Sequence, residues 1–213
     1  KFLIDCGTFQ GKRDESYFIN LNFPFDPSKI EAMILSHAHI DHTGLLPLLV
    51  RNGFRGKIYA TKPTTELCDI MLRDSAHIQE FEAEWKNRKA KRSANNAVVE
   101  PLYTMEDADG VIRRFVPCHY NTIVEVCEGV KIRFTDIGHL LGSASIEVWL
   151  TEDGNTKKIV FSGDIGNKHQ PLLKDPTPTK EADYVVMEST YGDRLHPKDK
   201  LDYVAELTKV LQE

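Results

Sequence analysis

The run His37-Ala38-His39-Ile40-Asp41-His42 constrains this chain more than any other feature of its 213 residues. The apolar stretch from residue 31 to 36, directly before it, has the length and composition of a short β-strand. Closely spaced leucines from Thr43 to about Gly53 predict a helix after it. The sequence therefore predicts a strand, an irregular loop rich in metal-binding side chains, and a helix.

The side chains of this loop can bind more than one cation. His37 and His39 share a face of an extended segment, because side chains two residues apart point the same way. Asp41 and His42 come after the chain turns toward the helix, so they can reach a second cation close by. Imidazole nitrogen with carboxylate oxygen is a ligand set typical of zinc. We interpret the run as a metal site rather than as an ordinary polar loop.

Two further side chains can complete such a site, and each follows a predicted strand. His139 follows the strand at 130–135, and the glycines around it let the backbone approach a ligand closely. Asp164 follows the strand at 158–163, where a carboxylate can bridge two cations. A single histidine before two leucines is more often a core residue. Beside the His37 run, it is interpreted as a ligand.

The rest of the chain alternates between β-type and helical patterns. Strands are expected at 1–5, 56–61, 122–127, 129–136, 145–150, 157–162 and 184–188, and helices at about 64–86, 104–114 and 203–213. We expect Thr64 and Thr65 to cap the long helix and Thr104 to cap the next one. Asp153-Gly154 is expected to join two strands as a hairpin. This mixture predicts an α/β (α+β) fold of layered sheets and helices.

The composition agrees with one globular domain, since 41% of the residues are hydrophobic and 28% are charged. No apolar stretch reaches the roughly 20 residues that cross a bilayer, and the N-terminus lacks a signal-peptide pattern. A cytoplasmic protein without membrane contact is expected. The four cysteines show no C-x-x-C pairing and are expected to be buried thiols. They are Cys6, Cys68, Cys118 and Cys127.

The charge distribution bears on whether the protein binds nucleic acid. A formal net charge of −5 argues against a protein that coats nucleic acid by charge alone. It leaves room for a local basic surface, and Lys86 to Arg92 has five basic residues in seven. This run is interpreted either as a solvated helix end or as a contact for a phosphate backbone.

Five motifs together resemble those of the metallo-β-lactamase superfamily, and more narrowly those of its β-CASP branch of RNA-processing nucleases. They are Asp5 to Gly11, His37 to His42, Gly138 to Ser143, Phe161 to Asp164, and Met187 to Arg194. The last motif discriminates most, because a Glu-Ser-Thr-Tyr-Gly stretch leads into an inserted second domain in β-CASP nucleases.

This resemblance implies a metallo-β-lactamase-like αββα sandwich, here incomplete. Residues 1–195 would form that domain without its first strands, and residues 196–213 would be the truncated start of the β-CASP domain.

Position by position, the resemblance implies two Zn²⁺ ions, with Mn²⁺ or iron as alternatives. His37, His39 and His139 would hold one zinc. Asp41, His42 and Asp164 would hold the other, with Asp164 bridging.

The resemblance also assigns roles beside the metals. Asp5 would orient the loop without binding metal, and Glu188 matches the first acidic motif of the β-CASP branch. The family's last histidine ligand has no counterpart in the chain. Neither has the histidine that usually pairs with the Glu188 position.

The implied activity is hydrolysis of RNA phosphodiesters by a hydroxide that bridges the two ions. Asp41, Asp164 and Glu188 would be the catalytic residues. Single-stranded RNA is the expected partner, and formation of a homodimer stays open, as does cleavage from an end or internally. The 213 residues are not expected to perform the reaction unaided.

Three alternative functions stay open from the sequence. They are a small-molecule (thio)ester or lactam hydrolase of the same fold, a DNA nuclease, and a non-catalytic scaffold subunit. Glu188 has its own alternative, as a carboxylate that is hydrogen-bonded at a strand end. The other histidines are less informative: His77, His119 and His169 are expected at the surface, and His196 either borders the substrate cleft or makes a structural hydrogen bond.

Overall fold

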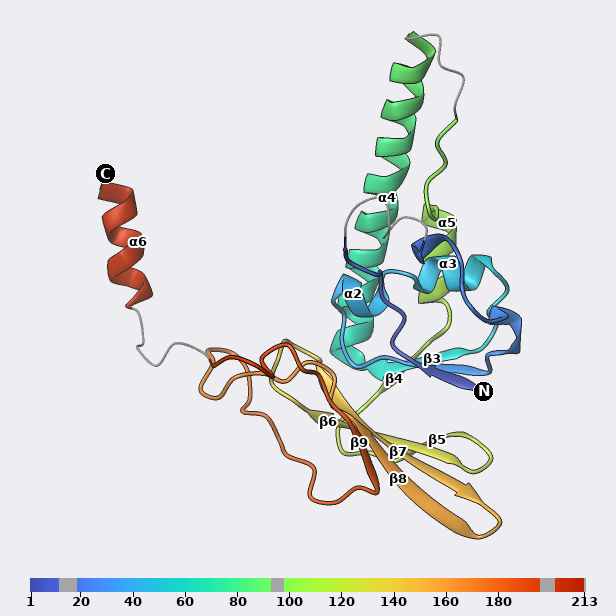
Figure 1. The fold of residues 1–213 in the computed structure, drawn as a ribbon, viewed down its shortest axis with the longest axis vertical. Helices are drawn as coiled ribbons and strands as arrows, with labels where there is room; N and C mark the ends of the chain where they lie inside the picture. The colour runs from blue at the N-terminus through green and yellow to red at the C-terminus, as the bar shows by residue number, and fades with distance from the viewer. Residues whose placement is uncertain (12–18, 93–97, 196–201, 213) are drawn as a thin grey trace.

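Two β-sheets lie face to face, and helices cover the outer side of the first sheet (Figure 1). The computed structural model describes residues 1–11, 19–92, 98–195 and 202–212. Its elements are, in chain order, β1 (Phe2–Ile4), the 3-10 helix η1 (Pro27–Lys29), β2 (Ala32–Ile34), α2 (Ile40–Thr43), α3 (Leu46–Arg51), β3 (Lys57–Thr61), α4 (Lys62–Arg92), α5 (Met105–Ile112), β4 (Phe115–Cys118), β5 (Val124–Cys127), β6 (Val130–Asp136), β7 (Ala144–Glu152), β8 (Asn155–Phe161), β9 (Tyr184–Val186) and α6 (Tyr203–Gln212).

The first sheet has the order β1-β2-β3-β4, and all its neighbouring strands are parallel. Parallel neighbours need crossover connections, and helices usually provide them. In this sheet α2 and α3 connect β2 to β3, and α4 and α5 connect β3 to β4. Both faces of the sheet are covered. The apolar character of β2, whose three residues are all buried, follows from this arrangement.

The second sheet has the order β5-β6-β7-β8-β9 and is antiparallel except for the parallel pair β8 and β9. The expected hairpin between β7 and β8 is confirmed. Asp153 and Gly154 at its tip have φ of 50° and 77°, as a two-residue hairpin turn of this kind requires. The parallel strand β9 arrives after a long irregular segment, from 162 to 183.

Two hydrophobic cores result, one on each face of the first sheet. Alternate residues of a strand point to opposite faces. Met33 and Leu35 accordingly pack among the helices, whereas Ala32 and Ile34 pack against the second sheet. The core between the sheets also contains the fully buried Phe134 of β6. The predicted α/β class with layered sheets is thereby confirmed.

Several local expectations need correction. The helix expected from Thr43 to about Gly53 is the shorter α3, and a separate short helix, α2, already begins at Ile40 inside the His37 run. The long helix α4 begins at Lys62 and continues to Arg92, beyond the expected end at residue 86. Its cap is Thr61, whose hydroxyl accepts a hydrogen bond from the Thr64 amide at 3.4 Å. Neither Thr64 nor Thr65 is the cap, because both already lie inside the helix. The Thr104 cap is confirmed, with a full capping box.

Strand β4 was not expected at all, because Pro117 interrupts its apolar pattern. β4 is the last strand in the order of the first sheet, a position where a proline is tolerated.

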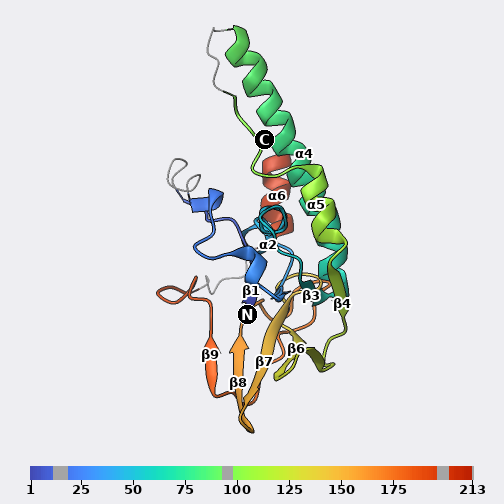
Figure 2. The ribbon, with the colours of Figure 1, turned by 90° about the vertical axis from the view of Figure 1, so that its right-hand side faces the viewer.

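The helices that the structure describes around the first sheet, α2 to α5, do not extend to the second sheet (Figures 1 and 2). The outer face of the second sheet instead lies beside the irregular segment, as the lining of a cavity of about 510 Å³ shows. Val160, Val185, Pro176 and Pro178 are among the residues that line it.

The cysteines are free thiols, as expected. Cys6, Cys68 and Cys118 are buried, and Cys127 is half-buried. Burial raises the pKa of the Cys6 and Cys68 thiols to about 12. None of the helices in the described part of the chain is both long and apolar enough to span a membrane.

The core between the sheets predicts a large loss of stability on Phe134→Ala. We expect a loss of about 3–5 kcal/mol in the free energy of unfolding, because the ring is fully buried and its removal leaves a cavity. Phe81→Ala, at a position of α4 that is 57% exposed, is the matched control and should change stability by less than about 0.5 kcal/mol. Urea denaturation of both variants measures the difference. Equal losses would contradict this description of the core.

Candidate metal centre

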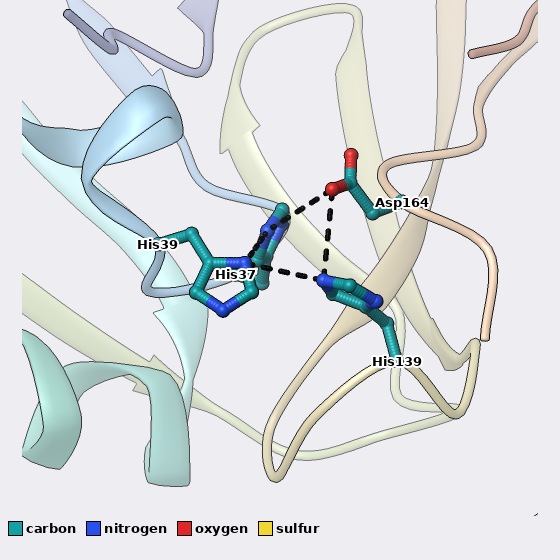
Figure 3. Close-up of side chains that lie close together, drawn as sticks. All are labelled: His37, His39, His139 and Asp164. Atoms are coloured by element: carbon teal, nitrogen blue, oxygen red, sulfur yellow. Dashed lines mark hydrogen bonds and ion pairs between the residues drawn. The ribbon is translucent and has the colours of Figure 1, made fainter. Parts of the chain in front are cut away.

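Four side chains from three loops converge at one edge of the two sheets (Figure 3). His37 and His39 follow β2, His139 follows β6, and Asp164 follows β8. One nitrogen or oxygen atom from each lies within 4.8 Å of the corresponding atoms of the other three. The group therefore unites the first sheet, which supplies two histidines, with the second sheet, which supplies the other two ligands.

The spacing of these atoms fits one metal ion. His37 Nε2 and His139 Nε2 each lie 3.1 Å from His39 Nδ1. Asp164 Oδ2 lies 3.8 Å from His37 Nε2 and 3.6 Å from His139 Nε2. An ion about 2.0–2.1 Å from each donor would separate neighbouring donors by roughly 3.3 Å in a tetrahedron. Three imidazole nitrogens and a carboxylate that converge in this way form a ligand set suited to zinc.

His37 is held in the form that a ligand requires. It is fully buried, and its Nδ1 lies 2.9 Å from the Ser36 hydroxyl, so its Nε2 faces the cluster. Burial, assisted by the neighbouring His42, His39 and His139, lowers the pKa of His37 to about 2. The ring is therefore neutral at physiological pH and offers a lone pair. Burial also lowers the pKa of His139, and the repulsion from His39 acts in the same direction.

A second set of ligand atoms lies on the other side of Asp164. Its Oδ1 is 3.2 Å from His42 Nε2, whereas its Oδ2 faces the first cluster. Asp41 Oδ2 is 3.9 Å from the same His42 nitrogen. The two oxygens of Asp164 thus face different histidines, which is the arrangement expected for a bridging carboxylate. Asp41 and His42 lie outside the group of four that shares one centre.

Asp5 joins the two halves of the loop without pointing at the cluster. Its Oδ1 accepts the Ser36 amide at 2.8 Å. Its Oδ2 accepts the Ser36 hydroxyl at 2.7 Å and lies 2.8 Å from His42 Nδ1. Burial alone would lower the pKa of His42, but the hydrogen bond and charge of Asp5, together with Asp164 and Asp41, raise it. Asp5 therefore fixes which nitrogen of His42 faces Asp164.

Glu188 is close to the cluster but is bonded to the backbone. Its Oε1 accepts the Ile165 amide at 2.6 Å, one residue after Asp164. Its own amide donates to Ser162 Oγ at 3.1 Å. Both bonds hold the turn that carries Asp164. No hydrogen bond or ion pair among the described residues joins the Glu188 carboxylate directly to one of the four clustered side chains.

Some residues that shape the site were not singled out from the sequence. Ser36 links Asp5 to His37, and Ser143 Oγ accepts the amides of His139 and Leu140 at 3.0 and 3.1 Å. Gly7 leaves no room for a side chain, because a Cβ there would come within 1.5 Å of the Asp41 carbonyl oxygen. All three lay inside or beside the quoted motifs, so proximity to the ligands was the signal that could have identified them.

The remaining histidines lie away from the site. His77, His119 and His169 are exposed, as expected. His196 lies outside the described residues.

A layered fold thus gathers three histidines and an aspartate at the edge of two sheets, where they could hold a metal ion. The model of the metallo-beta-lactamase superfamily domain matches residues 1–188, and the chain belongs to this superfamily.

Individual proteins show the same relationship. A ribonuclease of Thermus thermophilus is 34% identical over 212 residues, which cover 100% of this chain and 43% of that protein. A transcription termination factor of Methanococcus maripaludis is 30% identical over 196 residues, or 90% of this chain and 28% of that protein. The chain thus spans less than half of either relative. A solved metallo-beta-lactamase of Cronobacter sakazakii aligns with 80% of this chain and 51% of its own, at 18% identity and a TM-score of 0.46. The match to the family model and the two sequence relatives confirm the resemblance drawn from the sequence motifs.

The contact at Gly7 predicts that Gly7→Ala damages the metal centre from a distance. An added methyl group must displace the backbone at Asp41 and His42, so we expect a loss of about 1–3 kcal/mol in stability and a weaker affinity for zinc. Gly192→Ala is the control, since its nearest neighbour would be Ser189 O at 3.1 Å. Urea denaturation and competition with a zinc chelator measure the two effects. Unchanged zinc affinity in Gly7→Ala would contradict the proposed coupling.

Proposed function

We propose that this chain is the metal-binding part of a ribonuclease that hydrolyses RNA phosphodiesters at a pair of zinc ions. The observation that carries the proposal is the convergence of His37, His39, His139 and Asp164 on one centre. The names of the relatives, a ribonuclease and a transcription termination factor, support RNA as the substrate. A third relative, from Methanocaldococcus jannaschii, is named a probable RNase and is 31% identical over 217 aligned residues.

The proposed ligands divide into two sets. His37, His39 and His139 would hold one ion, and Asp41 and His42 would hold the other. Asp164 would contact both, because its two oxygens face different histidines. Zinc is the metal that we propose for the mixed imidazole and carboxylate set, and Mn²⁺ or iron stays an alternative.

When bound, such ions activate water and stabilise the charge that builds on a phosphoryl oxygen. The residues of the chain orient the donor atoms, and burial keeps the ring of His37 neutral by lowering its pKa. Ser36 fixes the ring of His37, and Asp5 fixes the ring of His42. Asp41 and Asp164, the proposed catalytic carboxylates, would offset part of the positive charge of the two cations. This preorganisation is what makes a metal site effective in catalysis.

For Glu188 we propose a positioning role. Its carboxylate already accepts the Ile165 amide and so holds the turn of Asp164. The family motif implies a different role, in which Glu188 helps to protonate the leaving group. That role would need Glu188 in its protonated form, or a second residue that supplies the proton. The two roles make different demands on this side chain, so they can be separated by substitution.

The domain division stays part of the proposal. We propose that residues 1–195 belong to the metal-binding domain and that 196–213 begin a second one. The apolar side chains of α6, among them Val204, Leu207 and Leu211, are 59–77% exposed. This agrees with a helix that packs against a further domain. Single-stranded RNA as the substrate and a cytoplasmic location also stay predictions, and the formation of a homodimer stays open.

Asp164→Asn tests the dinuclear site in the full-length protein. Replacing one carboxylate oxygen by an amide removes a proposed contact to one ion and half of the compensating charge. We expect fewer than two zinc ions per chain by elemental analysis and a loss of RNA cleavage of at least about 100-fold. Asp175→Asn, in an exposed loop, is the control and should retain both. Wild-type activity with the normal metal content would overturn the assignment. Cleavage of a lactam or thioester instead of RNA would place the protein among small-molecule hydrolases.

Glu188→Gln and Glu188→Ala separate positioning from proton transfer. Glutamine keeps a carbonyl oxygen that can accept the Ile165 amide, whereas alanine does not. If positioning dominates, Glu188→Gln should retain its metal content and cleave RNA within about threefold of the wild type, and Glu188→Ala should lose both. A loss of 100-fold or more in Glu188→Gln, with full metal content, would show that the carboxylic acid itself takes part in catalysis.

A further inference from the structure

The last turns of α4 expose aromatic and basic side chains on one surface. Phe81 and Trp85 are 57% and 52% exposed. From Trp85 to Arg92 the helix contains five basic residues and no acidic one. Exposed aromatic rings on the surface of a helix are unusual and often mark an interaction site. We name the residues Phe81, Trp85, Arg88, Lys89, Lys91 and Arg92 the α4 tip.

The rings face away from the protein because the other side of the helix is already packed. Gln79 accepts the Leu102 amide at 3.2 Å, and Asn87 bonds both backbone groups of Val99, at 2.8 and 2.9 Å. Phe81 lies two residues after Gln79, and Trp85 lies two residues before Asn87. Two positions turn a helix by about 200°. Both rings therefore point away from the returning segment, and Figures 1 and 2 show this end of α4 projecting beyond the sheets.

The basic charge of the tip is only partly neutralised. Lys86 and Arg88 pair with Glu82 and Glu84 one turn earlier, at 3.2 and 3.8 Å. Within the part of the chain that the structure describes, neither Lys91 nor Arg92 has an ion-pair partner. Positive charge is thus concentrated here, although the chain as a whole has a net charge of −5.

The basic and aromatic groups are also in contact with one another. Lys89 Nζ lies 5.3 Å from the centre of the Trp85 ring. Cations beside exposed rings are the combination that binds single-stranded nucleic acid, in which the cations contact phosphates and the rings stack on bases.

The opposite end of α4 contacts the loop that carries His139 of the metal centre. Thr64 Oγ1 donates to the Gly142 carbonyl at 2.9 Å, in the loop that follows His139. Trp85 lies 21 positions further along the helix, which is about 30 Å. A stacked strand advances about 3.4 Å per nucleotide, so roughly nine nucleotides separate the two places.

From this arrangement we propose that the α4 tip is an auxiliary binding site for single-stranded RNA, about 30 Å from the metal centre along the helix. The proposal rests on the proposed function, since the RNA bound at the tip would be the substrate held at a distance from the cleaved bond. Long RNA would use both sites, and RNA of a few nucleotides would use only the metal centre.

A second copy of the chain is the competing occupant. Ile70 and Ile78, which are 69% and 48% exposed, continue the apolar surface toward the start of α4. A helix pair would use this whole stripe, whereas RNA would use only its basic end. Asp74 is exposed between the two isoleucines, and the basic residues are concentrated beyond them. Both observations favour RNA.

The test measures binding and cleavage separately in the full-length, metal-loaded protein. Fluorescence anisotropy gives the Kd for hydrolysis-resistant phosphorothioate oligouridylates of about 20 and about 6 nucleotides, lengths chosen on either side of the estimated span. Trp85→Ala should raise the Kd of the long oligonucleotide about tenfold, because one stacked base is lost. Trp85→Phe should restore it to within about twofold. Neither variant should change the KM or kcat for cleavage of the short RNA.

Charge supplies a second readout. The variant Lys91→Glu with Arg92→Glu should weaken binding of the long oligonucleotide and reduce the slope of log Kd against log salt by about 1.4, or about 0.7 for each lost phosphate contact. The control reverses two exposed lysines outside α4, Lys131 and Lys174. It should leave the slope unchanged.

Ile70→Ala distinguishes RNA from a second copy. It should leave both the Kd and the oligomeric state unchanged. If sedimentation shows a dimer that Ile70→Ala and Trp85→Ala both dissociate, while RNA affinity stays at the wild-type value, the stripe is a dimer interface and the proposal is overturned. Unchanged RNA affinity in Trp85→Ala without a dimer also overturns it. If the wild-type protein binds RNA but does not cleave it, the proposed function is refuted. The Kd measurements on the variants then still decide whether the α4 tip binds RNA.

Discussion

The carboxylate of Asp5 is the interaction on which the metal centre depends. It bonds the Ser36 amide, the Ser36 hydroxyl and the His42 ring, so it ties the end of β1 to both ends of the metal-binding loop. Asp5 itself has φ of 55°, a conformation that aspartate tolerates better than most residues. Without this carboxylate, Ser36 and His42 would lose their common acceptor. The order of the loop therefore begins with a residue that contacts no proposed metal.

The packing of the two sheets also fixes the position of the metal-binding loop, in addition to the hydrogen bonds of Asp5. The Ala144 amide donates to the Ser36 carbonyl at 2.9 Å, which joins the start of β7 to the end of β2. Gly163 lies against the Ser36 side chain, where an added Cβ would be 3.0 Å from the serine Cβ. Ser36 thus stands where the sheets meet and where their loops contribute ligands. Because His39 and His139 come from different sheets, their 3.1 Å contact exists only when the sheets are packed.

The sequence pointed to the side chains that cluster in the structure, but not to the residues that support them. His37, His39, His139 and Asp164 lie at strand ends, and the strand pattern and the choice of side chains were enough to group them. Ser36 and Gly7 are different, because their importance lies in what approaches them from elsewhere in the chain. Strand β4 was missed for a similar reason: a proline that breaks the pattern is tolerated at the last position of the first sheet. A sequence pattern reveals the local periodicity of a strand or helix. It does not reveal which residues from distant parts of the chain will lie in contact.

Folding and metal binding are expected to be coupled because the ligands come from both sheets. Burial of His37 beside three other histidines is unfavourable for its protonated form, and the low pKa of His37 expresses this cost. An ion that binds only the assembled cluster would stabilise the folded state in proportion to its affinity. The same ion would balance the neighbouring Asp41 and Asp164 carboxylates. A bound ion would therefore stabilise the junction of the two sheets as well as serve the chemistry of the site. The hydrogen bonds of Asp5 to Ser36 and His42 hold the metal-binding loop in position for that ion.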